Sequence, residues 1–276
     1  MMKTKRRLPT VQKNLSVLLL ATVALLGVAS LASAQRSTTP QAPMDTVGDF
    51  AVLGGTNVTC TAGSVVGDIG VSPGSAVPFT NTGCTTTGGT PPTTDAAAVQ
   101  ARTDFLNTYA ALQLQSASCV ALLGSTLSGE NLAPGVYCLD AVAKTGLLTL
   151  TGPADGVWIF LVDGALTGTN FSVTMAGGGQ PCNVFWAPTA AATLTTSAMK
   201  GNILAGNAID GSITMTGGSL AGNALANVAV TMTNVSVIGC DVLSGTPPSC
   251  KLKKRHGHDK HKDHKGKKKD KEHKDD

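Results

Sequence analysis

Aromatic and charged residues are scarce in this chain of 276 residues, at 4% and 14% of the composition. Helical domains normally carry many more charged side chains on their solvent-facing sides. Glycine is abundant, with 32 residues, and threonine recurs throughout. This composition favours short strands and tight turns, so we predict an all-β architecture.

Histidine is missing from the body of the chain, because all five histidines lie between His256 and His273. The absence excludes Ser-His-Asp catalysis and histidine-based zinc sites from the body. Carboxylates such as Asp155 and Asp210 stand alone among Gly, Ala and Thr, where a glycosidase would need a pair. We therefore expect no catalytic residues, no enzymatic activity, no cofactor and no metal site.

No apolar run reaches the ~20 residues that a membrane-spanning helix requires. The apolar run 15–28 is shorter, follows five basic residues within positions 3–13, and precedes Ala32-Ser33-Ala34. This is the pattern of a secretory signal peptide cut after Ala34. We predict a signal peptide at residues 1–34 and a mature protein without a transmembrane segment that is secreted or associated with the cell surface.

Seven cysteines in an exported chain are expected to be oxidised. Proximity in sequence suggests the pairs Cys60–Cys84, Cys119–Cys138 and Cys182–Cys240, with Cys250 left over. Spacing alone does not fix the connectivity.

The formal charge of +4 combines two segments of opposite sign. Residues 35–250 carry 4 basic and 11 acidic residues, a net charge of −7, whereas residues 251–276 carry 12 basic and 6 acidic ones. We predict that residues 244–276 form a disordered tail rich in Lys and His. Such a tail would attach to an anionic cell wall or polysaccharide, capture metal cations weakly, or only aid solubility; it predicts no specific nucleic-acid partner.

One segment of the body has a helical pattern, at about residues 94–115. Thr94 can cap it and Asp95 suits its first turn. Its expected apolar stripe consists of Val99, Leu106, Tyr109, Ala110 and Leu114. We expect a flexible lead-in at 35–44, a β domain at 45–243 and a loop at 80–94.

Segments of about twenty residues repeat in the second half of the body. Aligning Gly201, Gly222 and Gly239 matches the preceding segments TLTTSAMKG, TMTGGSLAG and TMTNVSVIG. Such units are typical of the coils of a β-solenoid, which bury their inward side chains by stacking. In each T-x-T strand the central residue then points inward and both threonines point outward.

Outward threonines on stacked coils would form a flat grid, because they lie ~6.8 Å apart along a strand and ~4.8 Å apart between strands. The aligned coils contribute Thr193, Thr195, Thr214, Thr216, Thr231 and Thr233, and the grid is extended by Thr149, Thr151, Thr167 and Thr169. The simpler alternative is that threonine suits any exposed strand.

Several blocks of sequence resemble the ice-binding-protein-like family of bacteria, fungi and algae. They include GDFAVLGGTNVT, VVGDIGVSPGSAV, LAPGVYCL, TLTGPADGVWIF, CNVFWAPTAAATL, KGNILAGNAI and SITMTGGSLAGNALA, in order from Asp45 to Gly239. The resemblance implies a right-handed β-solenoid of roughly triangular cross-section, with one helix packed alongside and early strands completed by the last coils. It also implies adsorption to ice through a flat, sparsely charged face, which makes the ten threonines ice-binding candidates.

Some members of that family carry a T-(A/G)-x-(T/N) motif on the ice-binding side. Here Thr167-Gly168-Thr169-Asn170 fits it, and Thr216-Gly217-Gly218-Ser219 fits with serine last. A match at Thr82-Gly83-Cys84-Thr85 falls in the predicted loop, and we interpret it as compositional. The alternative function is a cell-surface or matrix adhesin that does not bind ice and is anchored by its basic tail.

Overall fold

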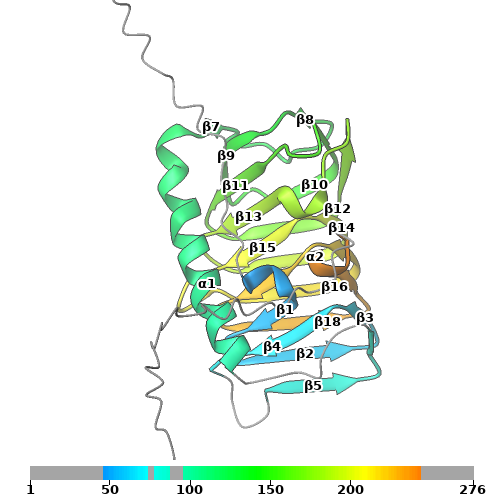
Figure 1. Cartoon of the computed structure of the whole chain (residues 1–276). Helices are drawn as coiled ribbons and strands as arrows, with labels where there is room; N and C mark the ends of the chain where they lie inside the picture. Colours follow the sequence, from blue (N-terminus) through cyan, green and yellow to red (C-terminus); the bar gives the residue numbers. More distant parts are fainter. Residues whose placement is uncertain (1–45, 74–77, 88–95, 244–276) are drawn as a thin grey trace, which may run out of the picture. The chain divides into compact units, whose positions relative to one another are not determined.

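Parallel strands stacked into successive coils make up most of the protein (Figure 1). The structure is a computed structural model and describes residues 46–73, 78–87 and 96–243. The predicted signal peptide, lead-in and tail therefore lie outside the described residues and stay predictions. Within the described ranges, no helix has the length and apolar character needed to cross a membrane.

The first sheet has eight strands, which lie in the order β4-β1-β17-β15-β13-β11-β9-β7. Nearly all of their side chains are apolar, because one side faces the solenoid interior and the other faces a helix. We call this sheet the helix face. Its strands are β4 (Asp68–Val71), β1 (Phe50–Gly54), β17 (Ala224–Ala226), β15 (Asn202–Ala205), β13 (Val184–Pro188), β11 (Trp158–Asp163), β9 (Gly135–Asp140) and β7 (Val120–Ala121).

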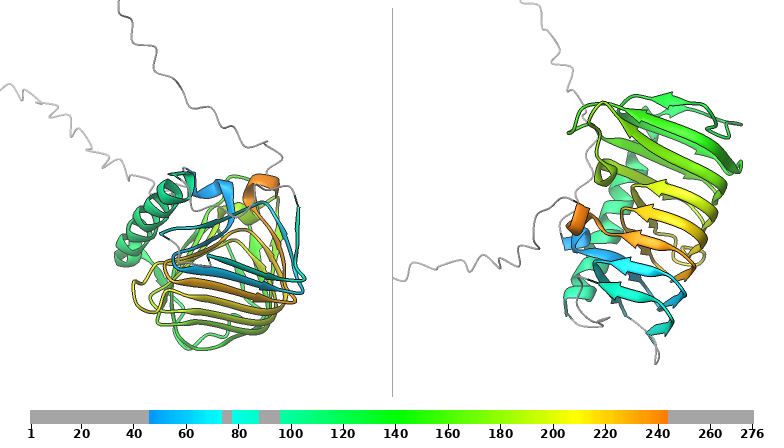
Figure 2. Two further views of the ribbon diagram at one scale, coloured as in Figure 1. Left: turned by 90° about the horizontal axis from the view of Figure 1, so that it is seen from below. Right: turned by 90° about the vertical axis from the view of Figure 1, so that its right-hand side faces the viewer.

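The second sheet has eleven strands and bends to form two further sides of the coil. Its main path runs through β5 (Phe79–Thr82), β2 (Asn57–Thr61), β18 (Ala229–Thr233), β16 (Ile213–Ala221), β14 (Ala192–Lys200), β12 (Leu166–Ala176), β10 (Lys144–Thr151) and β8 (Asn131–Leu132). Off this path lie β19 (Ser236–Ile238), β3 (Ser64–Val66) and β6 (Thr85–Thr87). The view along the stack shows these flat sides with the helix outside one of them (Figure 2, left).

The N-terminal strands pair with the C-terminal coil and extend the stack beyond it. Strand β1 pairs in parallel with β17, β2 with β18, and β3 with β19, although each pair is separated by more than 150 residues. The polypeptide thus leaves the stack after its first coils and returns to it from the opposite end. This is the discontinuous coil that the family resemblance implies, and the stacked parallel sheets with one long helix confirm the predicted fold class.

Aromatic rings stack along the inner side of the helix face. Phe160 lies between its register partners Tyr137 and Trp186, with ring centroids 5.5 and 4.0 Å apart respectively. Few aromatic residues are therefore needed, because each ring covers the ring of the neighbouring coil. The indole N–H of Trp186 keeps a hydrogen-bond partner inside the core, because it donates to the carbonyl of Lys200 at 2.9 Å.

Helix α1 (Ala96–Gln113) packs on the outer side of the helix face and continues as a short 3₁₀ turn, η2 (Leu114–Ser118). The predicted apolar stripe is only partly correct: Leu106 and Tyr109 pack against the buried cluster, whereas Val99 and Leu114 are 52% and 82% exposed. The residues that face the sheet are buried, and they are Ala98, Ala101, Phe105, Thr108 and Leu112. This side combines the small residues Ala98 and Ala101 with the large residues Phe105 and Leu112, and a search for large apolar residues alone misses the small ones. The expected cap, Thr94, and Asp95 lie outside the described residues.

Three disulfides join the cysteine pairs suggested by proximity, which are Cys60–Cys84, Cys119–Cys138 and Cys182–Cys240. The last of these fixes α2 (Cys240–Leu243) to η3 (Pro181–Asn183), next to a further 3₁₀ turn, η1 (Thr46–Asp49). Cys250 lies outside the described residues.

The loop predicted at residues 80–94 is wrong over its first half. Residues Phe79–Thr82 and Thr85–Thr87 form β5 and β6, which pair with β2 and β3 as an additional coil at the end of the stack. Threonine, glycine and proline dominate this segment, so its composition resembles that of a loop. These residues nevertheless form strands, because the backbone N–H and C=O groups at the edges of β2 and β3 are available for pairing, which composition does not reveal.

Candidate functional site

Twelve threonines stand in register on one side of the solenoid, which we call the threonine face. Strand pairing places Thr193 beside Thr214 and Thr231, and it places Thr195 beside Thr216 and Thr233. The six aligned threonines therefore share one face, as the repeat predicts. Two continuous rows cross six coils, and their members are Thr167/Thr169, Thr193/Thr195, Thr214/Thr216, Thr231/Thr233, Thr59/Thr61 and Thr80/Thr82.

The hydroxyl groups of these twelve threonines are available to solvent. Five of these side chains are half-buried, and the other seven are exposed. The exposed ones are Thr80, Thr82, Thr169, Thr193, Thr195, Thr214 and Thr216. Within the described part of the chain, none of the twelve hydroxyls makes a hydrogen bond to another protein group. Each can therefore bind water without giving up an internal hydrogen bond.

Apolar residues between the two rows fix the plane of the face. Leu194, Met215 and Met232 occupy the inward position between two threonines, and all three are buried. In the middle coils, the residue two positions before the first threonine is also small. These residues are Ala165, Ala191, Ser212 and Ala229. The face is flat because its inward residues are anchored and its outward residues are short.

A column of left-handed residues ends the threonine face at one corner. The residue directly after the second threonine has a positive φ in all six coils, and these residues are Ala62, Gly83, Asn170, Thr196, Gly217 and Asn234. This conformation turns the chain sharply onto the next side. At Gly218, a Cβ would lie 2.1 Å from the carbonyl oxygen of Ser197, so the backbones of adjacent coils approach here more closely than a side chain allows.

No charged side chain is exposed on the strand segments of the threonine face; Lys144 of β10, which pairs with Gly168 between Thr167 and Thr169, is fully buried. The neighbouring side is different, and we call it the mixed face. It is formed by β19, β3, β6, the part of β10 from Gly146 onward and the second halves of β12, β14 and β16. Its outward positions include Lys200 and Ile238 among serines and threonines. Of the two solvent-facing sides, only the threonine face presents a regular uncharged surface.

Two of the predicted face residues lie elsewhere. Strand β10 turns at Gly146, and its later residues pair with the second half of β12, so Thr149 lies beside Thr174 and Thr151 beside Ala176. Thr149 and Thr151 therefore belong to the mixed face, and the hydroxyl of Thr151 donates to the Asn131 side chain at 2.7 Å. The TLT triplet alone does not specify a side of the coil, because one strand can continue past a corner. The other eight predicted threonines do share the threonine face.

Four threonines of the face were not predicted, namely Thr59, Thr61, Thr80 and Thr82. Their triplets, TCT and TNT, follow the same T-x-T pattern. They lie at the opposite end of the sequence from the aligned repeats and join them only through the pairing of β2 with β18. The signal that could have found them is the residue after each triplet, Ala62 or Gly83, which matches the corner column.

The T-(A/G)-x-(T/N) motif does not keep one register on this face. In Thr167-Gly168-Thr169-Asn170 the motif begins in the first row and ends at the corner. In Thr216-Gly217-Gly218-Ser219 and Thr82-Gly83-Cys84-Thr85 it begins in the second row and crosses the corner. The last match is thus part of a coil and no compositional accident. The two threonine rows, rather than the motif, are the regular feature.

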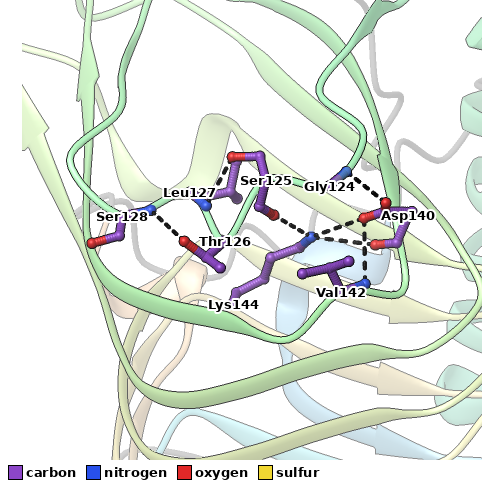
Figure 3. Close-up of polar contacts among 8 residues, drawn as sticks. All are labelled: Gly124, Ser125, Thr126, Leu127, Ser128, Asp140, Val142 and Lys144. Atoms are coloured by element: carbon purple, nitrogen blue, oxygen red, sulfur yellow. Dashed lines mark hydrogen bonds and ion pairs between the residues drawn. The ribbon is translucent and has the colours of Figure 1, made fainter.

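A partly buried ion pair between the end of β9 and the start of β10 has a structural role (Figure 3). The fully buried ammonium of Lys144 donates to the carbonyls of Ser125 and Asp140 and lies 3.6 Å from the Asp140 carboxylate. Burial lowers the pKa of Lys144, and the nearby Asp140 carboxylate opposes this shift. The backbone N–H of Gly124 lowers the pKa of Asp140. These bonds tie the loop at 122–130 over the end of the core and leave no free nucleophile.

Other polar groups do not assemble into a reactive site. Among the described residues, no group of three or more His, Cys, Asp or Glu side chains is placed to hold a metal ion. Burial raises the pKa values of Asp49 and Asp241, and repulsion from Asp68 adds to both shifts. These carboxylates lie at the corner formed by η1, β4 and α2 and not on the threonine face.

Known proteins with related sequences and structures define the class. Residues 52–238 match the family model described as Ice-binding-like, so the chain belongs to this family. It is 37% identical over 201 residues to an ice-binding protein of Nostoc sp. (strain HG1), covering 68% of this chain and 71% of that protein. It is 30% identical over 215 residues to ice-binding protein K3-B1 of Typhula ishikariensis, covering 69% of this chain and 86% of the other.

Solved structures agree with this assignment. The crystal structure of an ice-binding protein from the Antarctic ascomycete Antarctomyces psychrotrophicus matches with a TM-score of 0.59 and 27% identity, covering 71% of this chain and 97% of that one. The family is described by ice binding and not by a reaction, which agrees with the expectation that the chain is not an enzyme.

Proposed function

We propose that the protein adsorbs to ice through the threonine face and thereby limits the growth or recrystallisation of ice. The observation that carries the proposal is the pair of threonine rows, which continue in register across six coils without a charged side chain. Membership of the ice-binding-like family and the similarity to ice-binding proteins of other organisms support ice as the ligand.

Threonine suits a surface that must compete with liquid water for ice. Its hydroxyl anchors a water molecule and its methyl group restricts the neighbouring waters. Its β-branch limits rotamers, so little side-chain entropy is lost on contact. A charged side chain would instead hold a hydration shell of unsuitable geometry. We infer that the rows order water into a near-lattice arrangement before they meet the crystal.

Many weak contacts must act together for such adsorption to be effectively irreversible. Each anchored water contributes little by itself, so the affinity depends on the number of sites held rigidly in one plane. The buried residues beneath the rows and the parallel ladders between coils supply that rigidity. The mixed face lacks this regularity, because Lys200 interrupts its outward rows.

We further propose that the mature protein is exported and that its basic tail, residues 251–276, attaches it to an anionic cell wall or polysaccharide. The apolar run with its Ala32-Ser33-Ala34 site supports export, and the three disulfides suit an oxidising compartment. The contrast between the basic tail and the acidic body supports the attachment.

The test is a nanolitre freezing assay on residues 35–250, which lack the tail. We expect faceted ice crystals, a measurable gap between melting and freezing temperatures, and inhibition of recrystallisation. If the folded protein leaves crystals round and freely growing at millimolar concentration, ice binding is excluded.

The second candidate function is an adhesin with the same solenoid. The tail favours it, because an ice binder that acts in solution does not need a polycation. It predicts retention on cells that is lost when residues 251–276 are removed or salt is raised, together with no effect on ice. Comparing the full mature chain and residues 35–250 in both assays separates the two functions.

A further inference from the structure

We infer that the Cys60–Cys84 disulfide holds the terminal coil, β5 and β6, against the solenoid and so keeps Thr80 and Thr82 in the threonine face. The inference rests on the proposed function for its consequence on ice. Its structural part stands independently, and it assigns Cys60 and Cys84 as positioning residues for one of the six threonine pairs.

The terminal coil contributes almost nothing to the hydrophobic core. No residue of β5 or β6 is buried, and Phe79 is only half-buried. The inward position between Thr80 and Thr82 is filled by Asn81, where the middle coils have Leu194, Met215 or Met232. The missing apolar burial removes the main force that holds the other coils together.

Asn81 closes the corner of this coil instead. Its side-chain amide donates to the carbonyl of Cys84 at 3.1 Å, and its side-chain oxygen accepts from the backbone N–H of Cys84 at 2.8 Å. These bonds shape the turn at Gly83 but do not connect the coil to its neighbour.

Among the described residues, backbone hydrogen bonds attach this coil to the neighbouring coil of β2 and β3. The backbone N–H groups of Val58 and Ala62 donate to the carbonyls of Pro78 and Thr82. In the other direction, the N–H of Thr85 donates to the carbonyl of Gly63. An edge strand held by such bonds, with little apolar burial, opens readily.

The disulfide supplies the missing anchor. Cys60 is fully buried at the inward position of β2, whereas Cys84 lies in the terminal coil directly after the corner. The bond therefore runs from the interior of the solenoid to its last coil, with a Cα–Cα distance of 5.9 Å. It restricts the coil at the corner, two residues from Thr82.

The opposite end of the stack is closed differently. There Leu127 is fully buried and Leu132 nearly so, beside the Lys144–Asp140 pair. The Cys119–Cys138 disulfide near that end joins the residue directly after η2 to β9 on the helix face. Removing it does not touch the threonine face, so it provides a matched control.

Hydrogen–deuterium exchange on the double variant Cys60→Val/Cys84→Ala tests the inference. Valine keeps an apolar side chain at the inward position, as at Val58. We expect amide exchange across residues 79–87 to accelerate by roughly 30-fold or more, the lower end of what a disulfide contributes. Exchange in β12, β14 and β16 should stay unchanged. Cys119→Ala/Cys138→Ala should leave residues 79–87 as protected as in the parent.

A second measurement asks whether the disulfide acts through Thr80. In the parent, Thr80→Tyr should lower thermal hysteresis; in the Cys60→Val/Cys84→Ala background the same substitution should have no further effect, since the row is already displaced. Unchanged exchange at residues 79–87, or fully additive losses of hysteresis, would overturn the inference. Absence of hysteresis in the parent would overturn the proposed function and leave the exchange result valid.

Discussion

Thr195 on β14 is the register partner of Thr216 on β16, and both side chains project from the same exposed side of the sheet. This relationship places two hydroxyls in one row at the spacing of neighbouring strands, ~4.8 Å. Repetition of the same pairing over six coils converts a short triplet into an extended surface.

Thr216→Tyr should reduce thermal hysteresis several-fold, because a bulky ring near the middle of the face breaks its flatness. The free energy of unfolding should change by no more than about 0.5 kcal/mol, as for most surface substitutions. Nanolitre osmometry and thermal unfolding measure the two effects. Thr174→Tyr is the matched control, since Thr174 is an exposed threonine of the mixed face. Equal losses in both variants would assign activity to neither face.

Leu194→Ala should lower the free energy of unfolding by about 2–5 kcal/mol, because it opens a cavity beneath the threonine rows. Leu194 is only 3% exposed between Thr193 and Thr195. Denaturant unfolding gives the loss, with Thr193→Ala as a control that should stay within about 0.5 kcal/mol of the parent. A stable Leu194→Ala protein would show that the inward row is not needed to hold the plane.

Thr196→Asn should raise the free energy of unfolding by up to about 1 kcal/mol, because a β-branched residue is strained in the left-handed region and asparagine tolerates it. Thr196 has a φ of 49°, and the equivalent corners are Asn170 and Asn234. The hydroxyl of Thr196 donates to the Asn170 side chain at 2.6 Å, and an asparagine amide can replace that donor. Hysteresis should persist. A lower melting temperature would show that the Thr196–Asn170 bond outweighs the strain.

Thermal hysteresis should not depend on pH between about 5 and 9, because threonine hydroxyls do not titrate in this range. Stability should depend on pH. Burial raises the pKa of Asp241 above its ordinary value of 3.8, so between 3.8 and the raised value the folded state binds more protons than the unfolded state. The contribution of Asp241 to stability therefore falls as pH rises through that window.

Asp241→Asn tests this dependence. The variant should be more stable than the parent at pH 7. Its melting temperature should also change less between pH 4 and pH 7 than that of the parent, because the variant lacks the titrating carboxyl of Asp241. The lowered pKa of Asp140 acts in the opposite direction, since its contribution is lost as pH falls through its folded pKa, below 3.8. Asp140→Asn should flatten only the acid limb below pH 4. A parent-like profile for Asp241→Asn would contradict the assignment.

Repeats that lie close together in sequence are readable without coordinates. The alignment of Gly201, Gly222 and Gly239 predicts the pairing of β14, β16 and β18, because the aligned segments have equal length and apolar residues at equivalent inward positions. The same reasoning fails for β10, where a turn at Gly146 moves Thr149 and Thr151 to the mixed face. It also fails for Thr80 and Thr82, which lie in a segment with the composition of a loop.

The helix shows a related limit. Its existence follows from the pattern at residues 94–115, but the side that meets the sheet is lined by small residues such as Ala98 and Ala101. Hydrophobic periodicity identified Leu106 and Tyr109, which do pack on the sheet, but it does not register alanines that pack beside them.

The sequence by itself determined the fold class and the inward and outward alternation of each T-x-T strand, because both depend on local spacing and repetition, whereas it only suggested the disulfide pairs. Only the tertiary structure decided which triplets share a side. That choice depends on where each coil turns a corner and on which distant strands pair, as β2 does with β18 across the return of the chain. Such contacts arise from stacking free backbone edges and buried side chains, and no local window of sequence contains both partners.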